Sequence, residues 1–182
     1  MTERSEALAL LKRHLKTKNL VKHCLAVEAA MKSLAEKLDG DSTRWALAGL
    51  LHDIDYDRTM ETPEKHGLVA EEILKEEADL DEEMIYAIKA HPGKLPRETL
   101  MDKALYAADP LTGLIVAAAL MHPDKKIEAL DGEFILRRFN EKSFARGANR
   151  DIIRSCESFM PLEEFIDVVL DGMKGISSEL GL

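Results

Sequence analysis

Apolar residues recur at helical spacing along most of the chain. Between Asn19 and Leu38 the apolar positions, which alternate in steps of four and three, are Leu20, Cys24, Val27, Met31, Leu34 and Leu38. This spacing predicts an amphipathic helix with one buried stripe. His23 directly precedes Cys24, so we expect its imidazole at the edge of the buried face.

The next segment predicts a helix that is enclosed on all sides. A turn at Asp39-Gly40-Asp41 precedes it, and we expect Ser42 or Thr43 to cap its N-terminus. The stretch TRWALAGLL is almost continuously apolar and runs directly into His52 and Asp53. A helix that is apolar all round is usually buried, which predicts that this His-Asp pair lies near the protein interior.

Prolines delimit the helices expected in the middle of the chain. Pro63 fits the first turn of a helix on which His66 shares a face with Val69, Ala70 and Ile73. The following helix carries Met84, Ile88 and His91 on one face and ends at Pro92-Gly93. Both predicted helices therefore place a histidine on an otherwise apolar face.

A long helix is expected from about Thr99, with Leu105, Asp109 and Thr112 on one side. Pro110 removes a backbone hydrogen bond, so we expect a kink just after Asp109. Pro123 ends this helix, and Pro161 opens the last one. No segment shows the period-two alternation of a strand, so we predict an all-α fold in a single domain over residues 1–182.

Composition restricts the setting and the partners. The chain has 182 residues, of which 46% are apolar and 32% charged, and no run approaches the ~20 uninterrupted apolar residues of a membrane span. The N-terminus lacks a secretory signal pattern, which predicts a cytoplasmic protein with no membrane partner. A net charge of −9 argues against binding a nucleic acid polymer. Cys24 and Cys156 fit no disulfide framework and are expected to be buried.

The placement of histidine and aspartate on buried faces indicates a metal site. A buried carboxylate costs several kcal/mol unless it is paired or bound to a cation, and one divalent metal would compensate His23, His52, Asp53 and Asp109 together. Imidazole and carboxylate ligands without thiolates suit Fe, Mn, Zn, Ni or Co. With His66 and His91 the set could serve two ions, and Asp53 is the candidate bridge because it follows His52 directly.

The order and spacing of these residues resemble the HD superfamily of metal-dependent phosphohydrolases. The set runs His23, His52-Asp53, His66, His91, Asp109, with 28, 12, 24 and 17 residues in the successive intervals. The segments that carry the likeness, over roughly residues 15–115, are KHCLAVEAAMKSLAEKL, WALAGLLHDIDYD, HGLVAEEIL, AIKAHPGK and MDKALYAADPLTG. The whole chain is similar to small single-domain predicted HD hydrolases, and the spacing is similar to bacterial diadenosine tetraphosphate hydrolases.

This resemblance implies an all-helical HD-type domain that hydrolyses a phosphate ester or anhydride with metal-activated water. The substrate would be a nucleotide or another small phosphorylated molecule. By the same likeness, His23, His52, Asp53 and Asp109 match the primary metal ligands, and His66 and His91 match those of a second metal. Tyr56 replaces a glutamate found in some nucleotidases. The signalling phosphodiesterases have a Gly and a Lys after the His-Asp pair, where this chain reads IDYD. These departures argue against the cyclic-dinucleotide and deoxynucleotidase activities.

Several further residues are candidates for the reaction. Asp55 and Asp57 could act as general acid or base, or could cap a helix end or a loop. Lys94, Arg97 and Lys103 are expected to contact phosphate, and Lys103 is favoured because the likeness to the diadenosine tetraphosphate hydrolases extends to it.

A second group of basic residues follows, Arg137, Arg138, Lys142, Arg146, Arg150 and Arg154. It could recognise distal phosphates, although ion pairing with acidic helices is the favoured interpretation. Two other functions for the whole chain stay open: a noncatalytic nucleotide-sensing module and a purely structural metal site. The sequence does not predict the oligomeric state.

Overall fold

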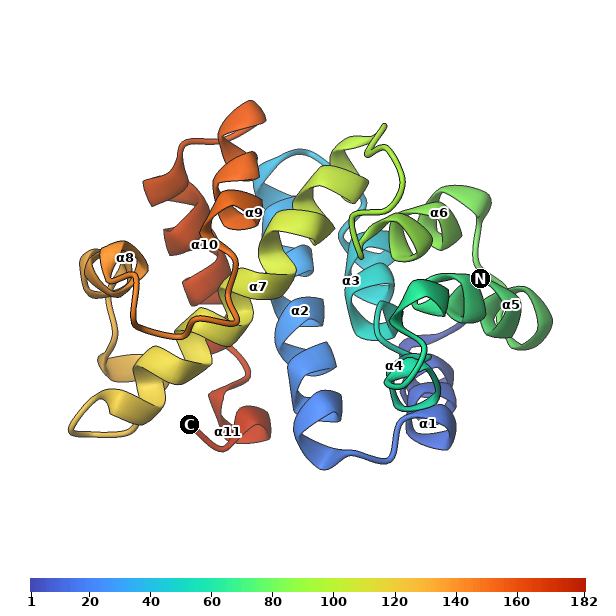
Figure 1. Cartoon of the computed structure of the whole chain (residues 1–182), viewed down its shortest axis with the longest axis horizontal. Helices are drawn as coiled ribbons and strands as arrows, with labels where there is room; N and C mark the ends of the chain where they lie inside the picture. Colours follow the sequence, from blue (N-terminus) through green and yellow to red (C-terminus); the bar gives the residue numbers. More distant parts are fainter.

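The computed structural model describes all 182 residues, and every regular element in it is helical (Figure 1). The α-helices are α1 (Arg4–His14), α2 (Lys18–Lys37), α3 (Ser42–Leu51), α4 (Tyr56–Thr59), α5 (Leu68–Glu77), α6 (Glu82–Ala90), α7 (Leu100–Met121), α8 (Gly132–Asn140), α9 (Arg150–Arg154), α10 (Leu162–Lys174) and α11 (Ser177–Leu180). Short 3₁₀ turns are η1 (Pro63–Lys65), η2 (Ile127–Ala129) and η3 (Ser155–Ser158). The predicted all-α fold is confirmed.

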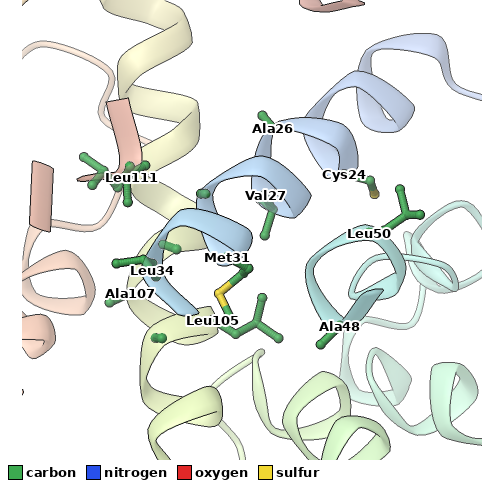
Figure 2. Packing of buried hydrophobic residues seen from close by; sticks show 14 of the residues in the cluster. Cys24, Ala26, Val27, Met31, Leu34, Ala48, Leu50, Leu105, Ala107 and Leu111 are labelled. Atoms are coloured by element: carbon green, nitrogen blue, oxygen red, sulfur yellow. The ribbon is translucent and has the colours of Figure 1, made fainter. Parts of the chain in front are cut away.

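Helix α2 lies at the centre of the molecule, between α3 on one side and α7 and α10 on the other (Figure 1). Its predicted stripe is buried, because Cys24, Val27, Met31 and Leu34 are all fully inaccessible to solvent. Figure 2 shows side chains from α2, α3 and α7 meeting in this core, among them Leu50. The central position of α2 brings His23 to the place where α3 and α7 converge.

Gly49 allows α3 to approach α2 closely. A Cβ built at this position would lie 2.7 Å from the carbonyl oxygen of Val27, closer than two such atoms can approach. Glycine is therefore required for the observed packing, since it has no side chain to collide with α2. The close contact holds the end of α3, with His52 and Asp53, against α2 and His23.

Two local predictions were wrong at helix starts. Asp41, not Ser42 or Thr43, caps α3, because its carboxylate accepts hydrogen bonds from the backbone N–H groups of Thr43 and Arg44. His66 does not lie on a helix: Pro63 opens the 3₁₀ turn η1, and His66 then has an extended backbone.

Gly67 separates His66 from α5. Its φ of +86° is readily available only to glycine, and α5 begins at the next residue, Leu68. His66 therefore precedes α5 on a connecting segment.

Helix α7 crosses the molecule and continues through Pro110. Its start is fixed by a capping box in which Thr99 and Asp102 satisfy each other's backbone N–H groups. By length and composition α7 could cross a membrane, with a mean hydropathy of 1.6, but 56% of that apolar window is buried inside the protein. Its apolar residues pack against α2, α6 and α10, so α7 is a core helix.

The C-terminal part contains more helices than predicted, namely α8, α9, α10 and α11. Pro161 does open a helix, α10, but α11 follows it, so α10 is not the last. Cys24 and Cys156 are both unpaired and buried, as predicted. Burial raises the pKa of both thiols, that of Cys156 to about 12, so both are neutral at physiological pH.

Candidate metal centre

Six histidines and aspartates from five parts of the chain converge on one place. His23 lies on α2, His52 and Asp53 directly follow α3, His66 precedes α5, His91 caps the end of α6, and Asp109 lies on α7. His52, Asp53 and His91 are buried at the base of the cluster. His23, His66 and Asp109 are partly exposed, which leaves one side of the cluster open to solvent.

Backbone carbonyls orient the two buried imidazoles. His52 donates from Nδ1 to the carbonyl oxygen of Gly49 at 2.8 Å, and His91 donates from Nδ1 to that of Ile88 at 2.6 Å. Each acceptor belongs to the residue three positions earlier, within the last helical turn. The hydrogen bond fixes the tautomer and leaves Nε2 of each ring directed at the cluster.

Side chains orient the other two imidazoles in the same way. Nδ1 of His66 donates to Oδ1 of Asp55 at 2.8 Å. Nδ1 of His23 lies 3.4 Å from Oγ1 of Thr112, whose hydroxyl donates its own proton to the carbonyl of Asp109 and can therefore accept from His23. All four histidines thus present Nε2 to the centre, as ligands of a metal ion do.

Asp53 lies between two pairs of histidines. Its Oδ1 is 3.3 Å from Nε2 of His66 and 3.4 Å from Nε2 of His91. Its Oδ2 is 3.4 Å from Nε2 of His52 and 3.7 Å from Nε2 of His23. Each oxygen therefore faces a different pair, which is the arrangement of a carboxylate that bridges two ions.

Asp109 completes the pair formed by His23 and His52. Its Oδ1 is 3.0 Å from Nε2 of His23, and the two Nε2 atoms are 3.2 Å apart. Ligand atoms around one ion lie about 3–3.5 Å apart when each metal bond is about 2.1 Å long. These separations fit a shared ion, and the cluster can therefore hold a divalent metal.

The charges of the cluster demand a cation. Burial would raise the pKa of Asp53, but the charge and hydrogen bond of His52, with those of the neighbouring imidazoles, hold it well below its usual value. Burial alone would lower the pKa of His52, but the charge of Asp53 outweighs it and raises this pKa to about 9. Neighbouring imidazoles likewise lower the pKa of Asp109. Asp53 and Asp109 are thus stable as anions only beside positive charge, which protonated histidines or a metal ion can supply.

A cavity of about 510 Å³ opens onto the cluster. Besides five of the six clustered residues, all except His52, its wall includes Leu20, Tyr56, Pro92, Tyr106, Pro110, Gly147, Asn149 and Ile152. Sequence reasoning missed Tyr56, Tyr106 and Asn149 as wall residues. Only Tyr106 carried a signal, because it lies three positions before Asp109 and therefore on the same face of α7.

None of the cations predicted to contact phosphate lines this cavity. Lys94 is exposed and donates to the carbonyl of Pro63. Arg97 donates to the carbonyl of Leu95 and stacks on the ring of Tyr106, with its Cζ atom 4.2 Å from the ring centroid. Lys103 lies six positions before Asp109, which rotates it about 120° around the axis of α7. The three residues expected to contact phosphate therefore all lie outside the cavity wall.

Asp55 and Asp57, the two candidates for acid–base chemistry, both hold neighbouring structure in place. Asp55 is fully buried, and besides His66 it accepts hydrogen bonds from the backbone N–H groups of Gly67 and Ala70. Asp57 accepts from the backbone N–H groups of Lys16 and Thr17 and from the hydroxyl of Thr17, between α1 and α2. Asp55 thus acts on the cluster through His66, whereas Asp57 lies apart from it.

The basic residues between 137 and 154 do not form one helical face, because α8 ends at Asn140 and α9 begins only at Arg150. Three of them pair with glutamates close in sequence: Arg137 with Glu133, Arg138 with Glu141, and Arg154 with Glu157. The favoured ion pairing is present, but it is local and not directed at other helices. Arg150 instead donates to backbone carbonyls.

Comparison with known proteins places this arrangement in a family. Ribonuclease Y of Desulfotalea psychrophila is 32% identical over 139 residues, which cover 74% of this chain and 26% of that protein. Ribonuclease Y of Oleidesulfovibrio alaskensis is 29% identical over 141 residues, or 75% of this chain and 27% of that protein. The chain thus spans about a quarter of the length of these relatives.

A relative of similar size is the uncharacterized protein MJ0778 of Methanocaldococcus jannaschii, 30% identical over 151 residues that cover 77% of this chain and 86% of that protein. No solved structure matches the chain significantly. The model of the HD domain matches residues 20–120, a range that contains all six clustered histidines and aspartates. The chain therefore belongs to the HD domain family.

Proposed function

We propose that this protein is a metal-dependent hydrolase of a phosphate ester or anhydride. The position of Asp53 carries the proposal, since its two oxygens face His66 and His91 on one side and His23 and His52 on the other. Two ions about 3.5–4 Å apart and joined by such a bridge are a recurrent device for phosphoryl chemistry. Membership in the HD domain family supports the same reaction class.

The chain's own residues divide into two ligand groups under this proposal. His23, His52, Asp109 and one oxygen of Asp53 would hold the first ion, and His66, His91 and the other oxygen of Asp53 would hold the second. Transition metals such as Fe, Mn, Zn, Ni or Co suit these nitrogen and oxygen donors. Such ions would supply the positive charge that polarises a phosphate oxygen and lowers the pKa of a water molecule. Asp55 and Thr112 would keep His66 and His23 in their liganding orientation.

The substrate proposed is a nucleotide or another small phosphorylated molecule. A cavity of about 510 Å³ accommodates a ligand of that size. No lysine or arginine lines the cavity, so neutralisation of phosphate would depend on the metal site, which favours a substrate with few phosphate charges. The tyrosines at positions 56 and 106 offer aromatic surface for a base.

An RNA phosphodiester is the second candidate, because two relatives are ribonucleases by name. The net charge of −9 disfavours a long polyanion, whose binding rests mainly on basic side chains. A short oligoribonucleotide in the substrate panel separates the two candidates.

The cytoplasm is the location we propose for this protein. Its two cysteines are unpaired and buried, which fits a reducing environment.

The test is metal analysis of the purified protein combined with a phosphatase and phosphodiesterase screen. We expect bound transition metal and turnover of at least one substrate. Asp53→Asn should lower kcat/KM by at least about a hundredfold, since a preorganised charged group in an active site contributes about 10²–10³ in rate. Asp39→Asn is the matched control, because Asp39 is exposed and asparagine tolerates its φ of +55°. Activity retained by Asp53→Asn would refute the mechanism, and tight nucleotide binding without turnover would favour a sensing module.

A further inference from the structure

A loop far from the metal ligands in sequence forms one side of their cavity. Residues 141–149 connect α8 to α9, and Gly147 and Asn149 from this loop line the cavity with His23 and Asp109. An adjoining pocket of about 370 Å³ shares His23, Asp109 and Gly147 and adds Ala145 and Ala148 from the same loop. The 141–149 loop therefore lies over the side of the cluster where His23 and Asp109 are exposed.

Arg150 holds the 141–149 loop in shape. Its guanidinium donates to the carbonyl of Phe139 at 3.1 Å, that of Ala145 at 2.8 Å and that of Ala148 at 2.6 Å. Three further acceptors are the carbonyls of Arg138, Glu141 and Phe144. Ala145 has a φ of +42°, a strained backbone conformation for a residue other than glycine, and one of these hydrogen bonds holds it there. Hydrogen bonds from Arg150 therefore stabilise one conformation of the 141–149 loop.

The side-chain oxygen of Asn149 accepts hydrogen bonds within the protein, whereas its side-chain NH₂ group donates none. Its Oδ1 accepts hydrogen bonds from the backbone N–H groups of Asp151 and Ile152, at 2.9 and 3.2 Å. These contacts require the oxygen on that side, so the side-chain NH₂ group is on the other. That NH₂ group donates to no atom of the protein, and Asn149 is exposed where it lines the cavity. The backbone N–H groups at the start of α9 are occupied and unavailable to a ligand.

We propose that the side-chain NH₂ of Asn149 is a substrate-binding donor that contacts a phosphate oxygen, with Arg150 as the residue that positions it. The inference rests on the proposed function, since it assigns a specificity residue to the same cavity. An amide donor suits a wall without lysine or arginine, because it binds a phosphate oxygen without adding charge. Its oxygen is locked by the helix cap, so its donor orientation is already set before substrate binds.

Two substitutions test the NH₂ donor of Asn149 separately from its role as the N-cap of α9. Asn149→Asp is isosteric and keeps the cap, because aspartate and asparagine cap helices equally well, but it places an acceptor where the donor was. Asn149→Ser also keeps a capping oxygen and removes the donor without adding charge. Asn140→Ser is the matched control, since Asn140 is exposed and its side chain makes no hydrogen bond. Hydrolysis of bis(p-nitrophenyl) phosphate and binding of inorganic phosphate are both measured on Mn²⁺-loaded protein.

We expect Asn149→Ser to lower kcat/KM about tenfold or more and Asn149→Asp to lower it further, with unchanged metal content and unchanged unfolding midpoint. Phosphate binding, followed by ³¹P line broadening, should weaken in the same order. Wild-type protein that binds phosphate without turnover, with binding weakened in Asn149→Asp, would refute the proposed function and support this inference. Turnover and phosphate binding equal to wild type in both variants would overturn the inference alone. Failure of the wild-type protein both to bind phosphate and to turn over any substrate would overturn both.

Discussion

Asp55 and His66 are joined by a hydrogen bond of 2.8 Å between Oδ1 and Nδ1. The same carboxylate is fully buried and uses Oδ2 to accept from the backbone N–H groups of Gly67 and Ala70. One buried side chain therefore fixes the orientation of a candidate metal ligand and the start of α5 together. Asp55 therefore contacts the metal site only through His66. This role does not require Asp55 to act as an acid or base on a substrate.

Asp55→Asn should weaken both metal binding and stability. Asparagine retains one acceptor oxygen but presents NH₂ to a group that already donates, so at least one buried contact is lost. We expect unfolding to become easier by about 1–3 kcal/mol. We also expect the affinity of the ion held by His66 to fall about 10–100-fold, as for other groups that orient a ligand. Urea unfolding and metal titration measure the two effects.

Asp57→Asn is the control for that experiment. Asp57 also accepts three hydrogen bonds, but from Lys16 and Thr17 between α1 and α2. Its loss should cost about 1 kcal/mol of stability and leave metal affinity unchanged. Equal losses of metal affinity in the two variants would show that Asp55 has no specific role in orienting His66.

Substitution of two glycines near the site by alanine should change the stability of the protein in opposite directions. Gly49→Ala places a methyl group against the carbonyl of Val27 and forces α3 away from α2. We expect a loss of about 1–3 kcal/mol, and weaker metal binding because the carbonyl of Gly49 orients His52. At Gly113, inside α7, a Cβ meets no atom within 4 Å. Gly113→Ala should therefore raise stability by about 0.5–1 kcal/mol, through higher helix propensity. Thermal and urea unfolding of both variants test the contrast.

Arg150→Gln should loosen the 141–149 loop. Glutamine cannot replace a guanidinium that donates to six backbone carbonyls, so we expect a loss of about 2 kcal/mol or more. Hydrogen exchange of the loop amides should accelerate, and kcat/KM should fall while metal content is retained. Arg154→Gln removes only an exposed pair with Glu157 and should change neither property. Loop exchange as slow as in wild type would contradict the role of Arg150.

The ion pair between Arg44 and Asp81 should contribute stability at pH values above about 3.8 and lose that contribution at lower pH. Hydrogen bonding to the Arg44 guanidinium lowers the pKa of Asp81 below its ordinary value of 3.8. A carboxyl group with a lowered folded-state pKa stabilises the fold above its unfolded value, and this contribution disappears as the pH falls through the folded value. Asp81→Asn keeps the cap of α6 and removes the pair.

We therefore expect Asp81→Asn to cost about 0.5–1 kcal/mol at pH 7, because the pair is partly exposed and water screens its charges. The difference from wild type should shrink once the pH falls below 3.8 and approach zero at lower pH. Urea unfolding between pH 7 and pH 2.5 measures it. A difference that persists at the acidic end would assign the effect to the cap and not to the ion pair.

Short-range patterns in the sequence were sufficient for the helices and for the set of metal-ligand candidates. Helical periodicity depends on neighbours three and four residues apart, so the stripe of α2 and the absence of strands were readable directly. Histidines and aspartates on apolar faces stood out because burial of such groups needs compensation. The backbone position of His66 was misjudged, since Gly67 and its positive φ end the regular pattern there.

Only the tertiary structure decided which groups share a site. The division of Asp53 between two pairs of histidines depends on the packing of five chain segments, and no spacing within one segment encodes it. Lys94, Arg97 and Lys103 are close to the ligands in sequence but lie outside the cavity wall. Asn149, 40 positions after Asp109, lies in that wall because Arg150 folds its loop back over α7. Proximity in sequence constrains one helical turn, whereas a cavity is set by how whole helices and their loops pack.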